Sequence, residues 1–172
     1  MIAKFALSLS PDGIDLLHLA AHGWRRVGRV DVVSETLDDA LADLRAKALE
    51  IDAEGFASKV IIPPDQIKFL TLDKPEASVA EVHAVLEGAT PYSLFDLVVD
   101  QISEGGKTYI AAVARDTLVE AESFADGHGF RPVAFVANPV GNGISQEFFF
   151  GPSEVMAELL GPAAERPRRR QA

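Results

Sequence analysis

Apolar and polar residues alternate along the opening of the chain. In FALSLSPDGIDLLHL (residues 5–19), an alternating segment with Phe5, Leu7 and Leu9 on one side runs into a Pro-Asp-Gly turn. Period-two alternation predicts a strand with one buried face, and glycine supplies the backbone freedom that a tight turn needs. A second turn signal, AAHGW, follows. We therefore expect three antiparallel strands, over residues 3–10, 14–20 and 25–33.

Three later segments place apolar residues at helical spacing. The first, residues 36–52, carries one stripe formed by Leu37, Ala40, Leu41, Leu44, Ala48 and Ile51. Spacings of three and four residues predict an amphipathic helix. Thr36 is placed to cap this helix, with Asp39 three residues on in the manner of a capping box. Two further helices are expected over residues 77–89 and 117–127.

The remaining segments have the pattern of strands. SKVIIPP (58–64) is a nearly unbroken apolar run stopped by two prolines, which is typical of a strand buried on both faces. IKFLTLD (67–73) alternates, and FDLVVDQIS and TYIAAVAR flank EGGK (104–107), a strong hairpin signal. We also expect strands over 130–139 and 144–150 and a short helix over 153–161. This order predicts an α/β fold with a mixed sheet that opens with antiparallel strands.

Composition narrows the classes of partner. The 172 residues carry 16 Lys and Arg against 26 Asp and Glu, a net charge of −10. Nucleic acid is excluded as the main partner, because its phosphate backbone rewards clustered Lys and Arg. The chain has no cysteine, so it has neither disulfides nor thiolate metal sites. No apolar run approaches the roughly 20 residues that cross a bilayer.

The candidates for metal chemistry are weak. His18 and His22 have the i, i+4 spacing that would place two imidazoles on one helix face. Their segment has the pattern of a strand running into a turn, and Leu19 stands where the helical zinc-peptidase motif has Glu. A metal-dependent nuclease needs converging carboxylates, the first from the middle of strand one, where this chain has serines. No spacing forces its carboxylates together, including Asp12, Asp15 and Asp100, so we predict no metal site.

The glycine-rich stretches carry no phosphate-loop signature. EGGKT (104–108) lacks the earlier glycine of a phosphate loop and does not precede a predicted helix. GNG (141–143) has no helix directly after it and reads as a loop. No activated nucleophile stands out either, so the sequence predicts no catalytic residue.

Four stretches, taken in order, resemble the actin-like cytoplasmic domains of bacterial assembly machines. They are FALSLSPDGIDLLHL, VIIPPDQIKFLTLDKP, EVHAVLEGATPYSLFDLVVD and YIAAVARDTLVEAESFADGHGFRPVAFVANP. In this order and polarity the chain is similar to the L protein of type II secretion and the M protein of type IV pilus assembly. The last stretch carries most of the resemblance, since in that family a strand, a helix, a glycine and a closing strand follow one another.

The resemblance implies a ribonuclease-H-like (actin-like ATPase) lobe with a small inserted α+β lobe. It assigns residues 1–139 to the actin-like lobe, with a smaller sublobe at about 64–108, and residues 140–161 to a C-terminal extension. Residues 162–172, which include four arginines, form a basic tail that we expect to be disordered. The family's second lobe has no counterpart here, so the chain is either a shortened relative or a fragment.

In actin-like ATPases the opening hairpin cradles the phosphates of ATP, and a carboxylate on strand one organises Mg²⁺. The resemblance would place Ser8, Ser10 and Gly13 near the phosphates of ATP with Mg²⁺. A serine occupies the expected place of the carboxylate, however, and Asp12 would repel phosphate unless a cation intervened. We therefore expect a structural hairpin without ATP hydrolysis, with nucleotide binding as the alternative and a metal-dependent nuclease as the second alternative.

The leading expectation is a non-catalytic scaffold that acts through protein–protein contacts. The resemblance implies an assembly ATPase or an inner-membrane assembly component as partner. It also implies a cytoplasmic location, peripheral to the inner membrane through those partners; a homodimer is a further option. The contact is expected on the smaller sublobe, where sheet edges can accept a strand or a helix, around Phe69, Leu70, Leu72, Tyr92, Leu94 and Phe95.

Overall fold

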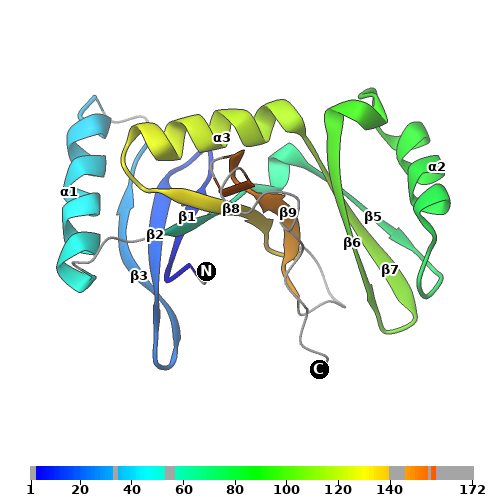
Figure 1. Cartoon of the computed structure of the whole chain (residues 1–172), viewed down its shortest axis with the longest axis horizontal. Coiled ribbons are helices and arrows are strands. Elements are labelled where there is room, and N and C mark those ends of the chain that lie inside the picture. The colour runs from blue at the N-terminus through cyan, green and yellow to red at the C-terminus, as the bar shows by residue number, and fades with distance from the viewer. Residues whose placement is uncertain (1–2, 33–34, 53–56, 140–145, 155, 158–172) are drawn as a thin grey trace.

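The computed structural model contains two β-sheets, and it describes residues 3–32, 35–52, 57–139, 146–154 and 156–157. The larger sheet has six strands in the order β3-β2-β1-β4-β8-β9, and the second has three in the order β5-β7-β6 (Figure 1). The fold is therefore a mixed α/β arrangement. The expected tail 162–172 and the GNG loop lie outside the described residues.

The six-stranded sheet is mixed in direction. Its strands are β1 (Phe5–Leu9), β2 (Ile14–Ala20), β3 (Gly23–Val30), β4 (Ser58–Ile61), β8 (Pro132–Ala137) and β9 (Phe148–Pro152). The strands β1, β2 and β3 pair antiparallel, as the alternating pattern and the two turns predict. β4 runs parallel to both β1 and β8, whereas β9 returns antiparallel to β8. The apolar run at 58–64 thus forms a central strand, with Val60 and Ile61 buried.

The second sheet is built from the segment between β4 and the third helix. Its strands are β5 (Ile67–Leu72), β6 (Leu97–Glu104) and β7 (Lys107–Ala114), all antiparallel. Two short 3₁₀ helices, η1 (Pro64–Gln66) and η2 (Leu94–Asp96), precede β5 and β6. The helix α2 (Val79–Ala89) packs on one face of this sheet through Val82 and Leu86.

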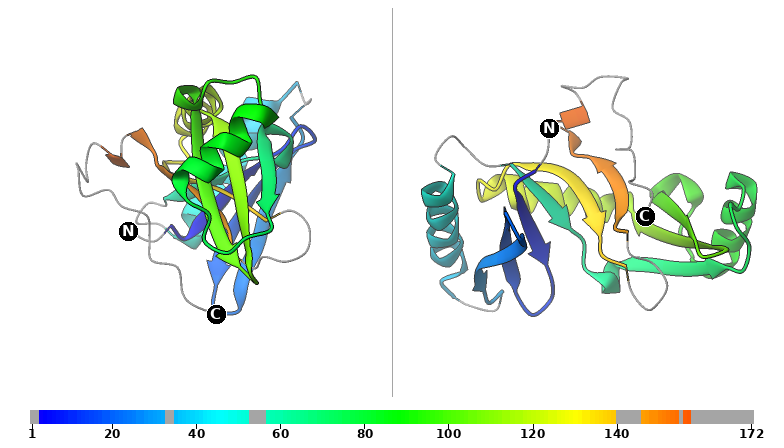
Figure 2. Two further views of the ribbon diagram at one scale, coloured as in Figure 1. Left: turned by 90° about the vertical axis from the view of Figure 1, so that its right-hand side faces the viewer. Right: turned by 90° about the horizontal axis from the view of Figure 1, so that it is seen from below.

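The other two helices share one face of the six-stranded sheet. α1 (Leu37–Ile51) and α3 (Arg115–Gly127) bury apolar side chains in the same cluster as Phe5, Leu7 and Leu16. That cluster continues into the second sheet through residues such as Ile102 and Val113, so the two sheets share a core. The opposite face carries a smaller cluster, to which no described helix contributes: Ala6, Ile61 and Val136 with Leu17 and Phe149. The right-hand view of Figure 2 looks from the side opposite α3.

The helix ends differ in part from the sequence predictions. Thr36 is the N-cap residue of α1, but its side chain makes no capping hydrogen bond. The predicted capping box with Asp39 was therefore wrong, since aspartate has one methylene fewer than the glutamate that such boxes use. A capping box does begin α2, between Ser78 and Glu81. The C-terminus of α3 is closed at Gly129 (φ 79°), where Phe130 N–H donates to Ala125 O.

Several predicted strand boundaries move, among them the strand predicted over 25–33, which is β3 (Gly23–Val30). Phe95, expected at the start of a strand, lies in η2, and β6 begins at Leu97. The strand expected over 130–139 is shorter, and β9 occupies Phe148–Pro152 instead of residues 144–150, of which 144 and 145 lie outside the described part. Of the expected helix at 153–161, the described residues Glu154, Met156 and Ala157 are helical.

Candidate functional site

The tip of the β1–β2 hairpin closes on itself. The Ser10 hydroxyl donates to the Gly13 carbonyl oxygen at 2.8 Å, and the Ser10 N–H donates to the same oxygen at 3.1 Å. The Gly13 N–H in turn donates to Ser10 Oγ at 3.1 Å. Two backbone N–H groups that could have held an anion are therefore engaged within the turn. A ligand would have to replace these bonds before it could use the groups.

A cavity of about 350 Å³ lies beside this tip, between the ends of β1 and β4 and the helix α3. Ser10 is among the residues that line it, whereas Ser8 and Gly13 are not. Ser8 lies on β1, two residues before Ser10, where it is paired with Asp15 of β2. The charged residues that line the cavity are Asp65 and Glu120, and no Lys or Arg is among them. The described wall therefore carries negative charge, which repels a phosphate chain.

The candidate metal ligands named from the sequence take separate positions in the described residues. No group of three or more His, Asp or Glu side chains in the described part of the chain gathers to hold a metal ion. His18 lies in β2 with its ring 4.9 Å from that of Phe5, and His22 lies in the following turn, as the sequence predicted. The Ser10 and Gly13 N–H groups are engaged within the turn, and the Arg29 guanidinium that borders Gly13 is paired with Asp15 at 3.0 Å.

The carboxylates considered at the sequence level take separate structural positions. Asp12 is exposed in the hairpin turn, and Asp15 forms an ion pair with Arg29 at 3.0 Å. Asp100 is buried, 2% exposed, where its Oδ2 accepts the Phe149 N–H at 2.8 Å and its Oδ1 accepts the Gln101 N–H. Asp100 thus joins β6 of one sheet to β9 of the other.

Four of the six residues expected at the partner surface are partly buried by packing within the protein. Leu70, Leu72 and Leu94 pack against the cluster beneath α2. Phe69 points to the opposite face of β5, where its ring lies 5.8 Å from that of Phe148. Both faces of β5 are thus partly covered, and among the described residues β5 pairs with β7 alone.

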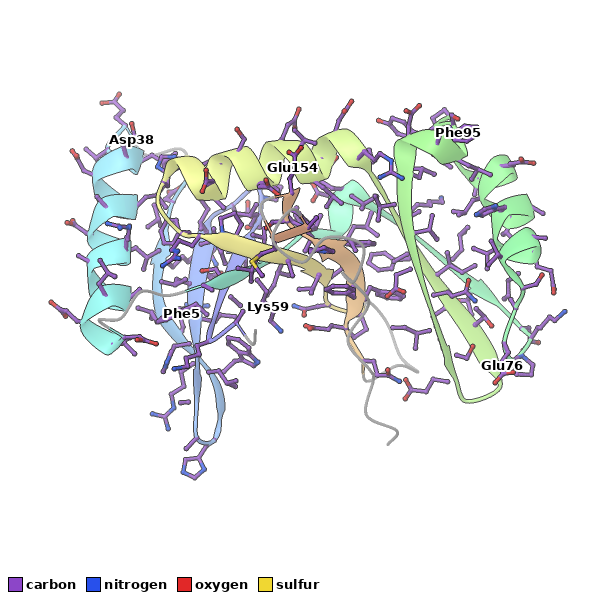
Figure 3. The ribbon with its side chains drawn as sticks, viewed as in Figure 1. Phe5, Asp38, Lys59, Glu76, Phe95 and Glu154 are labelled. Atoms are coloured by element: carbon purple, nitrogen blue, oxygen red, sulfur yellow. The ribbon has the colours of Figure 1, made fainter. Side chains whose placement is uncertain are left out.

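The other two residues are strongly exposed. Phe95 is 89% exposed and Tyr92 57%, and both precede β6. Phe95 points away from the ribbon at one end of the second sheet (Figure 3). Its backbone is fixed, since the Ser93 hydroxyl accepts the Phe95 N–H and Arg115 Nε donates to the Phe95 carbonyl at 2.9 Å. An exposed aromatic ring on a fixed backbone loses little conformational entropy when a partner covers it, so it is suited to anchoring an interface.

A larger cavity, about 460 Å³, was not anticipated from the sequence. It lies between α3 and the strands β6, β8 and β9, and Arg115, Glu122 and Glu154 supply charged groups to its wall. These elements are far apart in the chain, so no local motif could reveal it. The Glu154 N–H donates to Glu122 Oε1 at 2.6 Å, which ties the segment after β9 to α3.

The fold is similar to two solved structures from bacterial assembly machines. One is the cytoplasmic domain of EpsL, an inner-membrane component of the type II secretion system of Vibrio cholerae: TM-score 0.51, 15% identity, 76% of this chain and 55% of that chain. The other belongs to the PilM-PilN type IV pilus biogenesis complex: TM-score 0.51, 14% identity, 78% of this chain and 47% of that chain. The chain thus spans about half the length of the proteins it resembles.

Sequence comparison adds no relative to this structural likeness. No protein-family model matches the chain, and no curated protein sequence matches it. The likeness at 14–15% identity is one of fold, and it agrees with the family resemblance in the sequence. No helix in the described ranges is both long and apolar enough to span a bilayer.

Proposed function

We propose that this chain is a non-catalytic scaffold of a secretion-type or pilus-type assembly, working through protein–protein contacts. Its fold corresponds to the first lobe of an actin-like, ribonuclease-H-like protein, and the second sheet with α2 is its inserted sublobe. The observation that carries the proposal is the closed hairpin tip, in which Ser10 and Gly13 bond to each other beside an acidic cavity. A scaffold retains this hairpin as architecture without needing a phosphate site.

The fold likeness supplies the context of the proposal. EpsL is an inner-membrane component of a secretion system, and PilM and PilN form a pilus biogenesis complex. We infer that this chain also serves a cytoplasmic assembly platform and is held near the inner membrane through its partners. An assembly ATPase or an inner-membrane component is the expected partner, and Phe95 and Tyr92 are the expected anchors. A homodimer through the same residues is a further option.

Nucleotide binding is the second candidate, because the cavity at the hairpin tip lies where the sequence resemblance places a nucleotide. In that case Ser10 and Gly13 would need to release their bonds to each other, and a cation would need to offset Asp65 and Glu120. No Lys or Arg among the described residues lines that cavity, and the Arg29 guanidinium beside Gly13 is paired with Asp15. We therefore propose that ATP with Mg²⁺ is not a resident cofactor.

Thermal melting with ATP and Mg²⁺ separates the two candidates. A ligand present at about a hundred times its dissociation constant stabilises the folded state by about 2.7 kcal/mol, a readily measured shift. We expect no shift at millimolar ATP and Mg²⁺. A shift that Mg²⁺ alone does not produce, and that Gly13→Val abolishes, would overturn the scaffold proposal in favour of nucleotide binding.

A further inference from the structure

The β2–β3 hairpin forms an arm that extends beyond the rest of the six-stranded sheet (Figure 1). On this arm Leu19 of β2 lies opposite Trp24 of β3, and the two side chains are 39% and 38% exposed. The Lys59 ammonium lies 4.7 Å from the centre of the Trp24 ring and so supports its inner side. The arm therefore presents a tryptophan and a leucine side by side to solvent.

The same arm is basic in a protein that is otherwise acidic. β3 carries Arg25, Arg26 and Arg29, all exposed, whereas the whole chain has a net charge of −10. Arg26 and Arg29 share one carboxylate, Asp15, at 3.4 and 3.0 Å. No ion pair joins Arg25 to a carboxylate in the described residues. Three guanidinium groups beside one carboxylate leave a local excess of positive charge.

β3 is also a terminal strand. It pairs with β2 alone, so the backbone on its outer side has no strand partner among the described residues. Successive side chains of a strand alternate between faces, and the β2–β3 register puts Trp24, Arg26 and Arg29 on the same face as Leu17 and Leu19. An extended segment added along β3 would thus meet an apolar pair first and two guanidinium groups farther along.

We propose that the outer edge of β3 binds an extended, acidic segment of a partner protein, which adds to the sheet as a seventh strand. Its backbone pairs with β3, an apolar side chain covers Trp24, and carboxylates on that same face approach Arg26 and Arg29. This inference rests on the proposed function, because it names a kind of partner for the scaffold. It concerns a surface separate from Phe95.

Charge and hydrogen bonding discriminate against other occupants. A second copy of β3 added antiparallel would set arginine against arginine, which is unfavourable. The chain's own C-terminal segment carries four arginines near its end and would be repelled for the same reason. An anionic bilayer satisfies the guanidinium groups but leaves the edge N–H and C=O groups unpaired. An acidic strand satisfies both requirements.

Trp24 is the single tryptophan of the chain, so its fluorescence reports directly on the arm. The probe is a short peptide with Thr at every second position. The positions between the threonines carry Leu at one end of the peptide and Glu along the rest. We expect this peptide to produce a saturable blue shift of the Trp24 emission, and we expect its binding to weaken at higher salt. The analogue in which Lys replaces Glu should produce no shift. Two further peptides test the strand pairing: one is N-methylated at the odd-numbered backbone nitrogens and the other at the even-numbered ones. We expect at least one of these two peptides to lose binding.

Two matched variants test the charge. Arg26→Glu reverses a charge on the Trp24 face and removes the ion pair of Arg26 with Asp15 at 3.4 Å; it should weaken peptide binding about tenfold. Lys47→Glu, the same change on exposed α1, should leave it unaltered, and melting curves verify that both variants fold. Unchanged peptide binding by Arg26→Glu, or equal binding of the Lys peptide or of both N-methylated peptides, would overturn the proposal. So would a blue shift with anionic phosphatidylglycerol vesicles but not with the Glu peptide.

A failure of the β3 proposal can be distinguished from a failure of the scaffold proposal. A chain that ignores the acidic peptide yet recruits assembly components through Phe95 refutes the β3 inference alone. A chain that binds the peptide but shifts its melting temperature with ATP and Mg²⁺ refutes the non-nucleotide function alone.

Discussion

Asp100 on β6 accepts a hydrogen bond from the Phe149 N–H on β9, at 2.8 Å and across 49 residues of chain. This bond joins the two sheets at a point where the carboxylate is almost wholly buried. Beside it, Phe148 and Phe150 enter the core that both sheets share. The position of the second sheet against the first therefore depends on a polar contact as well as on apolar packing.

Asp100→Leu tests this link. The substitution leaves the Phe149 N–H buried without its acceptor, and removing a charged hydrogen-bond partner of this kind costs about 2–3 kcal/mol. Urea unfolding followed by circular dichroism measures the loss. The control is Asp96→Asn, an exposed carboxylate in η2, which should change stability by less than about 0.5 kcal/mol. If the two substitutions cost the same, Asp100 does not hold the sheets together.

The approach of α1 to β3 gives a second prediction. A Cβ on Gly28 would lie 2.7 Å from Leu44 Cδ1, so an alanine there requires the buried Leu44 side chain of α1 to shift. Gly28→Ala should destabilise the protein by about 1–2 kcal/mol through overpacking. Gly88→Ala is the matched control: nothing lies within 4 Å of its added Cβ, and a helical alanine should stabilise α2 by up to about 1 kcal/mol. Opposite signs in urea unfolding are the expected result; a neutral Gly28→Ala would contradict this packing.

The capping box of α2 predicts how the stability of the protein changes with pH. The Lys74 ammonium, 2.6 Å from Glu81 Oε2, lowers the pKa of the Glu81 carboxyl below its ordinary 4.5, and hydrogen bonds from the Ser78 N–H and hydroxyl lower it further. Because the folded state favours the carboxylate, this stabilisation is complete above the ordinary pKa and is lost as pH falls through the lowered one.

Acid titration of stability therefore distinguishes Glu81→Gln from the unaltered chain. Between about pH 6 and about pH 3 the unaltered chain should lose more unfolding free energy than Glu81→Gln, which has no charge to lose. Glu87→Gln, on the same helix, controls for removal of one carboxylate. Ser78→Ala should cost about 1 kcal/mol at neutral pH, because the Glu81 N–H loses its acceptor. Identical acid slopes for Glu81→Gln and the unaltered chain would refute the pKa assignment.

Local patterns in the sequence predict most elements of this fold. Alternation and turn residues predict β1 to β3, since a strand with one buried face and a glycine turn leaves a signature within a few residues. The stripe from Leu37 to Ile51 likewise predicts α1 to within one residue at each end. The capping box of α2 was also readable from Ser78 and Glu81, whereas the similar pair Thr36 and Asp39 was misleading.

Non-local features could not be predicted. The pattern of β5 shows that Phe69 and Leu70 point to opposite faces, but not that each face is covered, because the covering residues lie on α2 and β9. Asp100 looked like a solvated carboxylate, since its partner lies on a strand far along the chain. The 3₁₀ turn that exposes Phe95 was equally hidden, because an aromatic residue before an apolar run predicts a strand.

The most direct test of the scaffold account is affinity capture from the source organism with the tagged full chain, followed by mass spectrometry. The account predicts enrichment of inner-membrane or ATPase components of a type II secretion or type IV pilus system. Phe95→Ala should reduce that enrichment, and Ile51→Ala, an exposed apolar residue of α1, should not. Recovery of such components no higher than with an unrelated bait would contradict the account.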